Sequence, residues 1–107
     1  MVEKRFTLAN MILKEGALEI LELSKDNVAK QFANFKDLKN SRTGKYFSQT
    51  TISDRLKDMI EVKALEKVIT KSKLQKDVVG YRITERGLKI LETAYDFEEK
   101  LEKIIRK

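Results

Sequence analysis

The order of hydrophobic patterns in the second half of the chain is the feature that most restricts its fold. First comes a helical stripe, in which apolar residues recur at i, i+4, i+7 and i+8: Ile52, Leu56, Met59 and Ile60. Two short runs rich in β-branched residues follow, at 65–70 and 78–83, and they predict a hairpin. A second helical pattern then runs from Thr84 and Glu85 to about residue 106. Helix, hairpin and long helix therefore follow one another directly.

The first half of the chain predicts further helices. Apolar residues follow helical spacing from Phe6 to Leu21, and Gly16 can divide this stretch in two. Residues 28–32 are ambiguous, and a compact helical pattern follows with apolar residues three apart at Phe32, Phe35 and Leu38. The polar stretch 40–44 connects this pattern to the helical stripe, whose cap can come from Ser48, Thr50 or Thr51.

The net charge of +6 is concentrated in the middle of the chain. Residues 36–82 contain 12 basic and six acidic side chains, whereas the segments before and after them are neutral. A central basic surface suits a polyanion such as nucleic acid. No apolar run approaches the roughly 20 residues of a membrane helix and no convincing secretion signal is present, so we expect a cytoplasmic protein with no membrane partner.

The absence of Cys and His removes disulfides, thiolate nucleophiles, Cys/His zinc sites and imidazole bases. Asp54 and Asp58, one helical turn apart, could form a metal pair. Two carboxylates with this spacing on a basic helix are usually ion-pair partners of neighbouring Lys and Arg, and no third acidic ligand or general base converges on them in the sequence. We therefore expect no enzyme activity, no metal and no cofactor.

Two segments resemble a known family. They are Thr51-Ile-Ser-Asp-Arg-Leu-Lys-Asp-Met and, after the hairpin, Gly80-Tyr-Arg-Ile-Thr-Glu-Arg-Gly87. Together they resemble the MarR-like and HxlR-like winged-helix transcription regulators of archaeal, bacterial or viral type, in which T-x-S-x-R-L-x-x-L precedes the wing and Y-x-L-T-x-K-G follows it. Here Met59 replaces the second Leu and Arg86 the Lys. The resemblance covers roughly residues 17–95. It implies a mainly α fold with a small β-hairpin: a winged helix-turn-helix of three helices, a two-stranded wing and a long C-terminal helix.

Two positions depart from the family pattern. The family usually has Gly just after the recognition helix, where the backbone is left-handed, and Lys63 occupies that place at a cost of about 1 kcal/mol. The link 39–47 is also longer than the tight turn of the family.

The resemblance implies a partner, double-stranded DNA, with the recognition helix in the major groove and the basic wing on phosphates or in the minor groove. Gln can pair with adenine, Thr can contact the thymine methyl, and Arg can bind guanine or a phosphate. Lysines at the hairpin tip supply phosphate contacts, although they could instead protect an edge strand from aggregation. The aromatic residues Tyr46, Phe47 and Tyr81 are assigned to packing. The candidate DNA-binding residues are Ser48, Gln49, Thr50, Thr51, Ser53, Asp54, Arg55, Lys57, Lys36, Arg42, Lys45, Lys71, Lys73, Lys76 and Arg82.

The apolar stripe of the last helix continues beyond the point where it can cover a domain this small. We therefore expect one domain, 1–107, that forms a two-fold homodimer through its ends, 1–16 and 84–107, with recognition helices about 34 Å apart. The candidate dimerisation residues are Phe6, Ile12, Leu91, Tyr95, Leu101, Ile104 and Ile105.

These observations predict a sequence-specific, dimeric, repressor-like regulator of transcription that is associated with the nucleoid. Two alternatives stay open. One is a winged-helix protein–protein module whose basic surface meets an acidic partner, and the other is a sequence-independent, chromatin-type DNA binder. The sequence identifies no effector ligand.

Overall fold

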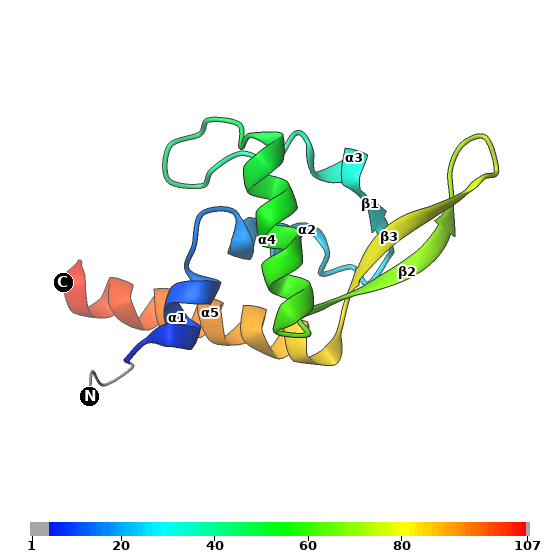
Figure 1. Ribbon diagram of the computed structural model, residues 1–107. Helices are drawn as coiled ribbons and strands as arrows, with labels where there is room; N and C mark the ends of the chain where they lie inside the picture. The colour runs from blue at the N-terminus through cyan, green and yellow to red at the C-terminus, as the bar shows by residue number, and fades with distance from the viewer. Residues whose placement is uncertain (1–4, 107) are drawn as a thin grey trace.

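The computed structural model describes residues 5–106, which form helices packed around a small antiparallel sheet (Figure 1). In chain order the elements are α1 (Thr7–Ile12), α2 (Ala17–Leu23), β1 (Lys30–Gln31), α3 (Phe32–Phe35), α4 (Gln49–Glu61), β2 (Leu65–Lys71), β3 (Asp77–Ile83) and α5 (Glu85–Ile105). The division of the first helical pattern at Gly16 is confirmed, with a φ of 93° at that residue. The α3 helix is shorter than its pattern predicts and ends before Leu38.

The sheet has three strands, which corrects the two-stranded wing predicted from the sequence. The central strand is β3. It pairs along its whole length with β2, from Leu65↔Ile83 to Lys71↔Asp77, and its far side pairs with β1. The two residues of β1 are too few to show the alternation that identifies a strand. The mainly helical arrangement with a small antiparallel sheet is compatible with a winged-helix fold.

The core lies where α2, α4 and α5 meet the start of the hairpin. Its buried apolar residues are Ala17, Ile20, Leu21, Phe35, Phe47, Ile52, Leu56, Met59, Ala64, Leu65, Ile83 and Leu91. Phe47 is buried as predicted and Tyr81 packs edge-on against Phe35, with ring centroids 6.1 Å apart. The prediction that Tyr46 packs in the core is wrong, since its side chain is 65 % exposed. Neighbouring residues of an extended segment point to opposite sides, so Tyr46 faces outward where Phe47 faces inward.

The junction between α4, β2 and α5 is held by close backbone contacts. Lys63 adopts the predicted left-handed conformation, with a φ of 62°. The Thr84 hydroxyl donates to the Lys63 carbonyl at 2.6 Å and accepts the N–H of Gly87 at 3.0 Å, which caps α5. A Cβ on Gly87 would lie only 2.1 Å from the Ala64 carbonyl oxygen. Gly87 therefore lets the first turn of α5 approach the α4–β2 connection.

Candidate nucleic-acid interface

α4 runs along the front of the molecule in Figure 1. Its outward face carries small polar and charged side chains. The helix begins at Ser48, whose hydroxyl oxygen accepts the N–H of Thr51 at 3.1 Å. The Ser48 hydroxyl also donates to the Thr51 hydroxyl oxygen at 2.9 Å, so these two side chains form the cap. The remaining outward side chains are exposed or half-buried: Gln49, Thr50, Ser53, Asp54, Lys57 and Glu61. Such a surface next to a helix N-terminus has the size and chemistry that base edges in a major groove require.

Arg55, which the sequence predicts as a DNA contact, lies on another face of α4 and is engaged within the protein. Its guanidinium donates to the carboxylate of Asp58, and the two side chains are only 18 % and 19 % exposed. The Lys14 ammonium lies 3.9 Å from the same carboxylate, and a Cβ on Gly16 would lie 3.2 Å from the Arg55 Cγ. Arg55 is therefore held beneath the α1–α2 turn by an ion pair. The prediction that Asp58 acts as an ion-pair partner is confirmed.

The segment 38–47, which we call the entry loop, is an ordered two-stranded turn that leads into α4. The Asn40 N–H donates to the Lys45 carbonyl at 2.8 Å, and the Phe47 N–H to the Leu38 carbonyl at 3.1 Å. The Ser41 hydroxyl and N–H both donate to the Glu19 carboxylate of α2, at 2.9 and 3.0 Å. These bonds explain why α3 stops early and why the link is longer than a tight turn. They also fix the place of the basic side chains next to the start of α4.

The β2–β3 hairpin projects away from the helical body and ends in a turn that carries Lys73 and Lys76 (Figure 1). Two other predicted DNA-binding residues of the hairpin are partly neutralised within it. Lys71 forms an ion pair with Asp77, its partner in the strand register, and Arg82 donates to the Glu66 carboxylate at 2.8 Å. The most available positive charges of the hairpin are therefore those at its tip.

A shallow hollow between α4 and the sheet brings together charged residues that are distant in the sequence. It is lined by Ser53, Leu56, Lys57, Ile60, Glu61, Lys67 and Tyr81. Lys67 is not among the binding residues predicted from the sequence, although strand alternation could have identified it. Lys67 pairs with Tyr81 in the register, on the face of β2 opposite to Glu66. It therefore faces α4 and adds a lysine across the hollow from Lys57.

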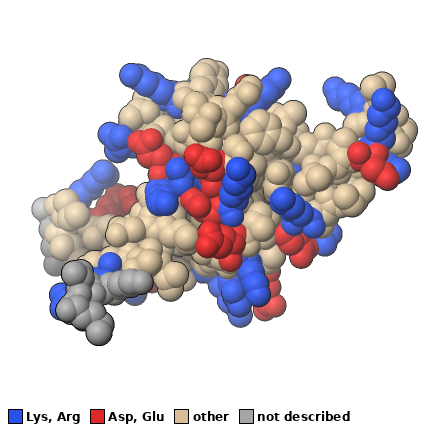
Figure 2. All heavy atoms as spheres, in the orientation of Figure 1, with Lys and Arg blue, Asp and Glu red and all other residues tan. Residues whose placement is uncertain are grey.

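The positive charge of the protein lies on both sides of α4 rather than on the helix itself. The segment 36–47 has an excess of three basic residues and the segment 65–83 another three, whereas 48–64 is balanced. In Figure 2, Lys and Arg gather on the hairpin and along the upper edge, while acidic and basic side chains alternate over the centre. Eight cations of the segment 36–82 form no ion pair within residues 5–106: Lys36, Lys39, Lys45, Lys57, Lys63, Lys67, Lys73 and Lys76. Arg42 lies 3.5 Å from Glu15.

The candidate dimerisation residues differ widely in exposure. Leu91 belongs to the core, at 4 % exposure, so it is not available to a partner. Phe6, Ile104 and Ile105 are each more than 70 % exposed. The Tyr95 hydroxyl donates to the Glu22 carboxylate of α2 at 2.6 Å, and this bond to an anion raises the pKa of Tyr95 to about 12.

Within the described part of the chain, no three acidic side chains are placed to hold a metal ion. None of the helices between residues 5 and 106 has both the length and the apolar character of a membrane span.

No protein-family model matches this chain, and no curated protein is significantly similar to it in sequence. The structure is similar to the crystal structure of a proposed transcriptional regulator from Thermoplasma acidophilum. The comparison gives a TM-score of 0.66 at 19 % sequence identity and covers 96 % of this chain and 93 % of that chain. At this level of identity, the likeness shows a shared fold.

Proposed function

We propose that this protein binds double-stranded DNA and regulates transcription as a winged-helix protein, with α4 in the major groove. The observation that carries this proposal is the charge arrangement. The segment 48–64, which has no net charge and includes the polar face of α4, lies between two segments that together hold the whole positive excess of the chain. Phosphate contacts supply affinity and orientation while base edges supply specificity, so this division of charge fits a DNA-reading surface. The shared fold with a proposed transcriptional regulator supports the same function.

The roles of the residues follow from their places. Gln49, Thr50 and Ser53 face outward on the first turns of α4 and would contact base edges. The exposed Asp54 carboxylate can only accept hydrogen bonds at neutral pH, so among base edges it suits the cytosine amino group. The phosphate-contacting residues would be Lys36, Lys39, Arg42, Lys45, Lys57, Lys67, Lys71, Lys73, Lys76 and Arg82.

We also propose that the working form is a homodimer in the cytoplasm, associated with the nucleoid. Two copies of α4 about 34 Å apart would read a roughly palindromic site. Bound to such a site near a promoter, the dimer would act as a repressor by excluding other proteins.

The salt dependence of duplex binding tests this function. If six of the eight cations that lack ion pairs each neutralise one phosphate, log K should fall with log salt at a slope of about −5 per subunit. Affinity for a 30-base-pair duplex, measured by fluorescence anisotropy, should then fall about 10³-fold between 50 and 200 mM salt. No binding at 50 mM salt, or a slope shallower than about −1, would exclude the proposal.

A charge-matched pair of variants localises the contacts. Lys73→Gln with Lys76→Gln removes two charges from the hairpin tip, and Lys14→Gln with Lys25→Gln removes two from the ends of α2. The first pair of substitutions should make the slope of log K against log salt less negative by about 2, and the second pair should leave this slope unchanged. Equal effects of the two pairs would indicate attraction by net charge alone.

A further inference from the structure

α5 carries two apolar stripes on different faces. The first packs against the core through Leu91 and ends at Tyr95, whose hydroxyl is bonded to Glu22 of α2. The second, which we call the seam, has the alternating four-and-three spacing of a coiled-coil interface: Ile90, Ala94, Phe97, Leu101 and Ile104. Ile90, Ala94 and Leu101 of the seam are half-buried, whereas Phe97 and Ile104 are 49 % and 74 % exposed. The core of one subunit therefore covers the first stripe but leaves Phe97 and Ile104 of the seam exposed.

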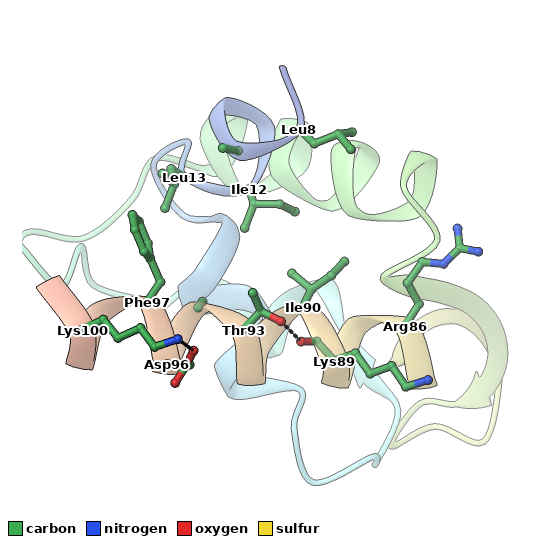
Figure 3. A pocket seen from close by; sticks show the side chains of 12 residues that line it. Leu8, Ile12, Leu13, Arg86, Lys89, Ile90, Thr93, Asp96, Phe97 and Lys100 are labelled. Carbon is green, nitrogen blue, oxygen red and sulfur yellow. Dashed lines mark hydrogen bonds and ion pairs between the residues drawn. The ribbon is translucent and has the colours of Figure 1, made fainter. Parts of the chain in front are cut away.

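α1 lies over the first half of the seam and leaves an apolar groove of about 510 Å³ (Figure 3). In Figure 3, Ile12 and Leu13 of α1 lie above Ile90 and Phe97 of α5, with the groove between them. Leu8 and Leu13 on the α1 side are 73 % and 53 % exposed. The charged lining residues Lys89 and Lys100 are paired on their own helix, with Glu85 and Asp96. The groove thus offers an apolar surface rather than an anion site.

The charges along α5 indicate which occupant fits. Residues 92–99 include four acidic side chains and no basic one, whereas residues 100–106 include three basic side chains and one acidic. Two such helices attract each other when they lie antiparallel, because the acidic half of one then faces the basic half of the other. A parallel arrangement would place like charges side by side.

We propose that a second copy of this chain fills the groove, with its α5 antiparallel along the seam. In this register Ala94 lies opposite the partner subunit's Ile104, and Phe97 lies opposite the partner subunit's Leu101. The small side chain of Ala94 leaves room for the isoleucine, which enters the groove between α1 and α5. This inference deepens the proposed dimer by naming its surface, direction and register, and its tests contain no DNA.

Cysteine crosslinking tests the direction and register, because the natural chain has no Cys. Ala94→Cys and Ile104→Cys are prepared as separate variants and oxidised with copper phenanthroline, alone and as an equimolar mixture. The antiparallel register predicts a disulfide-linked dimer in the mixture and little in either variant alone. A parallel arrangement would crosslink each variant by itself. That result, or no crosslinking in the mixture, would overturn the proposal.

Sedimentation equilibrium tests the surface with a matched pair of aromatic residues. Phe97 on the seam and Tyr95 on the first stripe are 49 % and 45 % exposed on the same helix. Phe97→Ala should raise the dimer dissociation constant at least about tenfold, and Tyr95→Ala should change it less than about threefold. Circular dichroism confirms that both variants are folded. An unchanged dissociation constant in folded Phe97→Ala would refute the proposal that the seam forms the dimer surface. Binding of folded Phe97→Ala to a half-site duplex then tests the proposed DNA contact separately.

Discussion

Replacing Gly87 by Ala tests whether close backbone contact holds α5 against the α4–β2 connection. Gly87 is buried in the first turn of α5. A Cβ there would lie 2.1 Å from the Ala64 carbonyl oxygen and 2.7 Å from the Ile83 Cγ1, whereas ordinary contacts begin at 3.4 Å. One backbone segment must therefore move by more than about 1 Å to accept a single methyl group.

The expected loss of stability combines three effects. Gly→Ala at an unhindered helical position stabilises a protein by about 1 kcal/mol. Overpacking a rigid site costs about 1–3 kcal/mol or more. Moving Ala64 also weakens two bonds that its carbonyl accepts, one from the Thr84 N–H at 3.0 Å and one from the Thr84 hydroxyl at 3.1 Å, whose proton is shared with the Lys63 carbonyl; together they are worth up to about 2 kcal/mol. The net decrease in the free energy of unfolding should be about 2–4 kcal/mol, from a total near 5–15 kcal/mol for a domain of this size.

Urea denaturation followed by circular dichroism at 222 nm measures this decrease, and thermal unfolding should show a Tm lower by about 10–25 °C. Gly44→Ala is the control, because Gly44 has a φ of 73° but no atom lies within 4 Å of the added Cβ. The free energy of unfolding of Gly44→Ala should decrease by about 1 kcal/mol, because only backbone strain is added. If Gly87→Ala were as stable as the natural protein, the contact between α5 and Ala64 would not be the constraint described here.

Three other predictions concern single features of the molecule. Bonding to Glu22 raises the pKa of Tyr95 to about 12, so the stabilisation from this bond is complete below pH 10 and is lost as the pH rises through 12. At pH 8 the urea concentration at the unfolding midpoint should therefore be lower for Tyr95→Phe than for the natural protein, and this difference should disappear above pH 12. Lys63→Gly should raise the free energy of unfolding by about 0.5–1 kcal/mol, because glycine relieves the left-handed strain at a φ of 62°. A destabilised Lys63→Gly variant in urea titrations would contradict this. Gln49→Ala and Ser53→Ala should each reduce discrimination between a selected duplex and a scrambled one by about 1–3 kcal/mol in competition assays. Equal affinity of the natural protein for every duplex would instead favour a chromatin-type binder.

Local sequence patterns predicted the elements that matter most for the proposed function. The buried stripe of α4 and the hairpin form close to their expected bounds, and of the three candidate caps it is Ser48 that begins α4. These features depend on side-chain spacing and capping within a few residues, so they can be identified without knowing the fold. The left-handed backbone at Lys63, which the family resemblance implied, also forms.

Elements too short to show one full period of the hydrophobic pattern were not predicted correctly from the sequence. The two residues of β1 form a strand only because β3 lies beside them. The α3 helix ends before Leu38 because the Leu38 carbonyl accepts a hydrogen bond from Phe47 in the entry loop. In both places, a partner that is distant in the sequence decides the backbone conformation.

The sequence by itself determined the order of the helices and of the two hairpin strands, the net charge of +6 and its central location. Only the tertiary structure decided which of these charges are available. It placed Arg55 in a partly buried ion pair, brought Lys67 across from Lys57 and divided the basic excess between the two sides of α4. It also separated the apolar residues of α5 into a core stripe and an open seam. The physical reason is that periodicity is a local property of the chain, whereas the partner of a side chain depends on how distant elements pack.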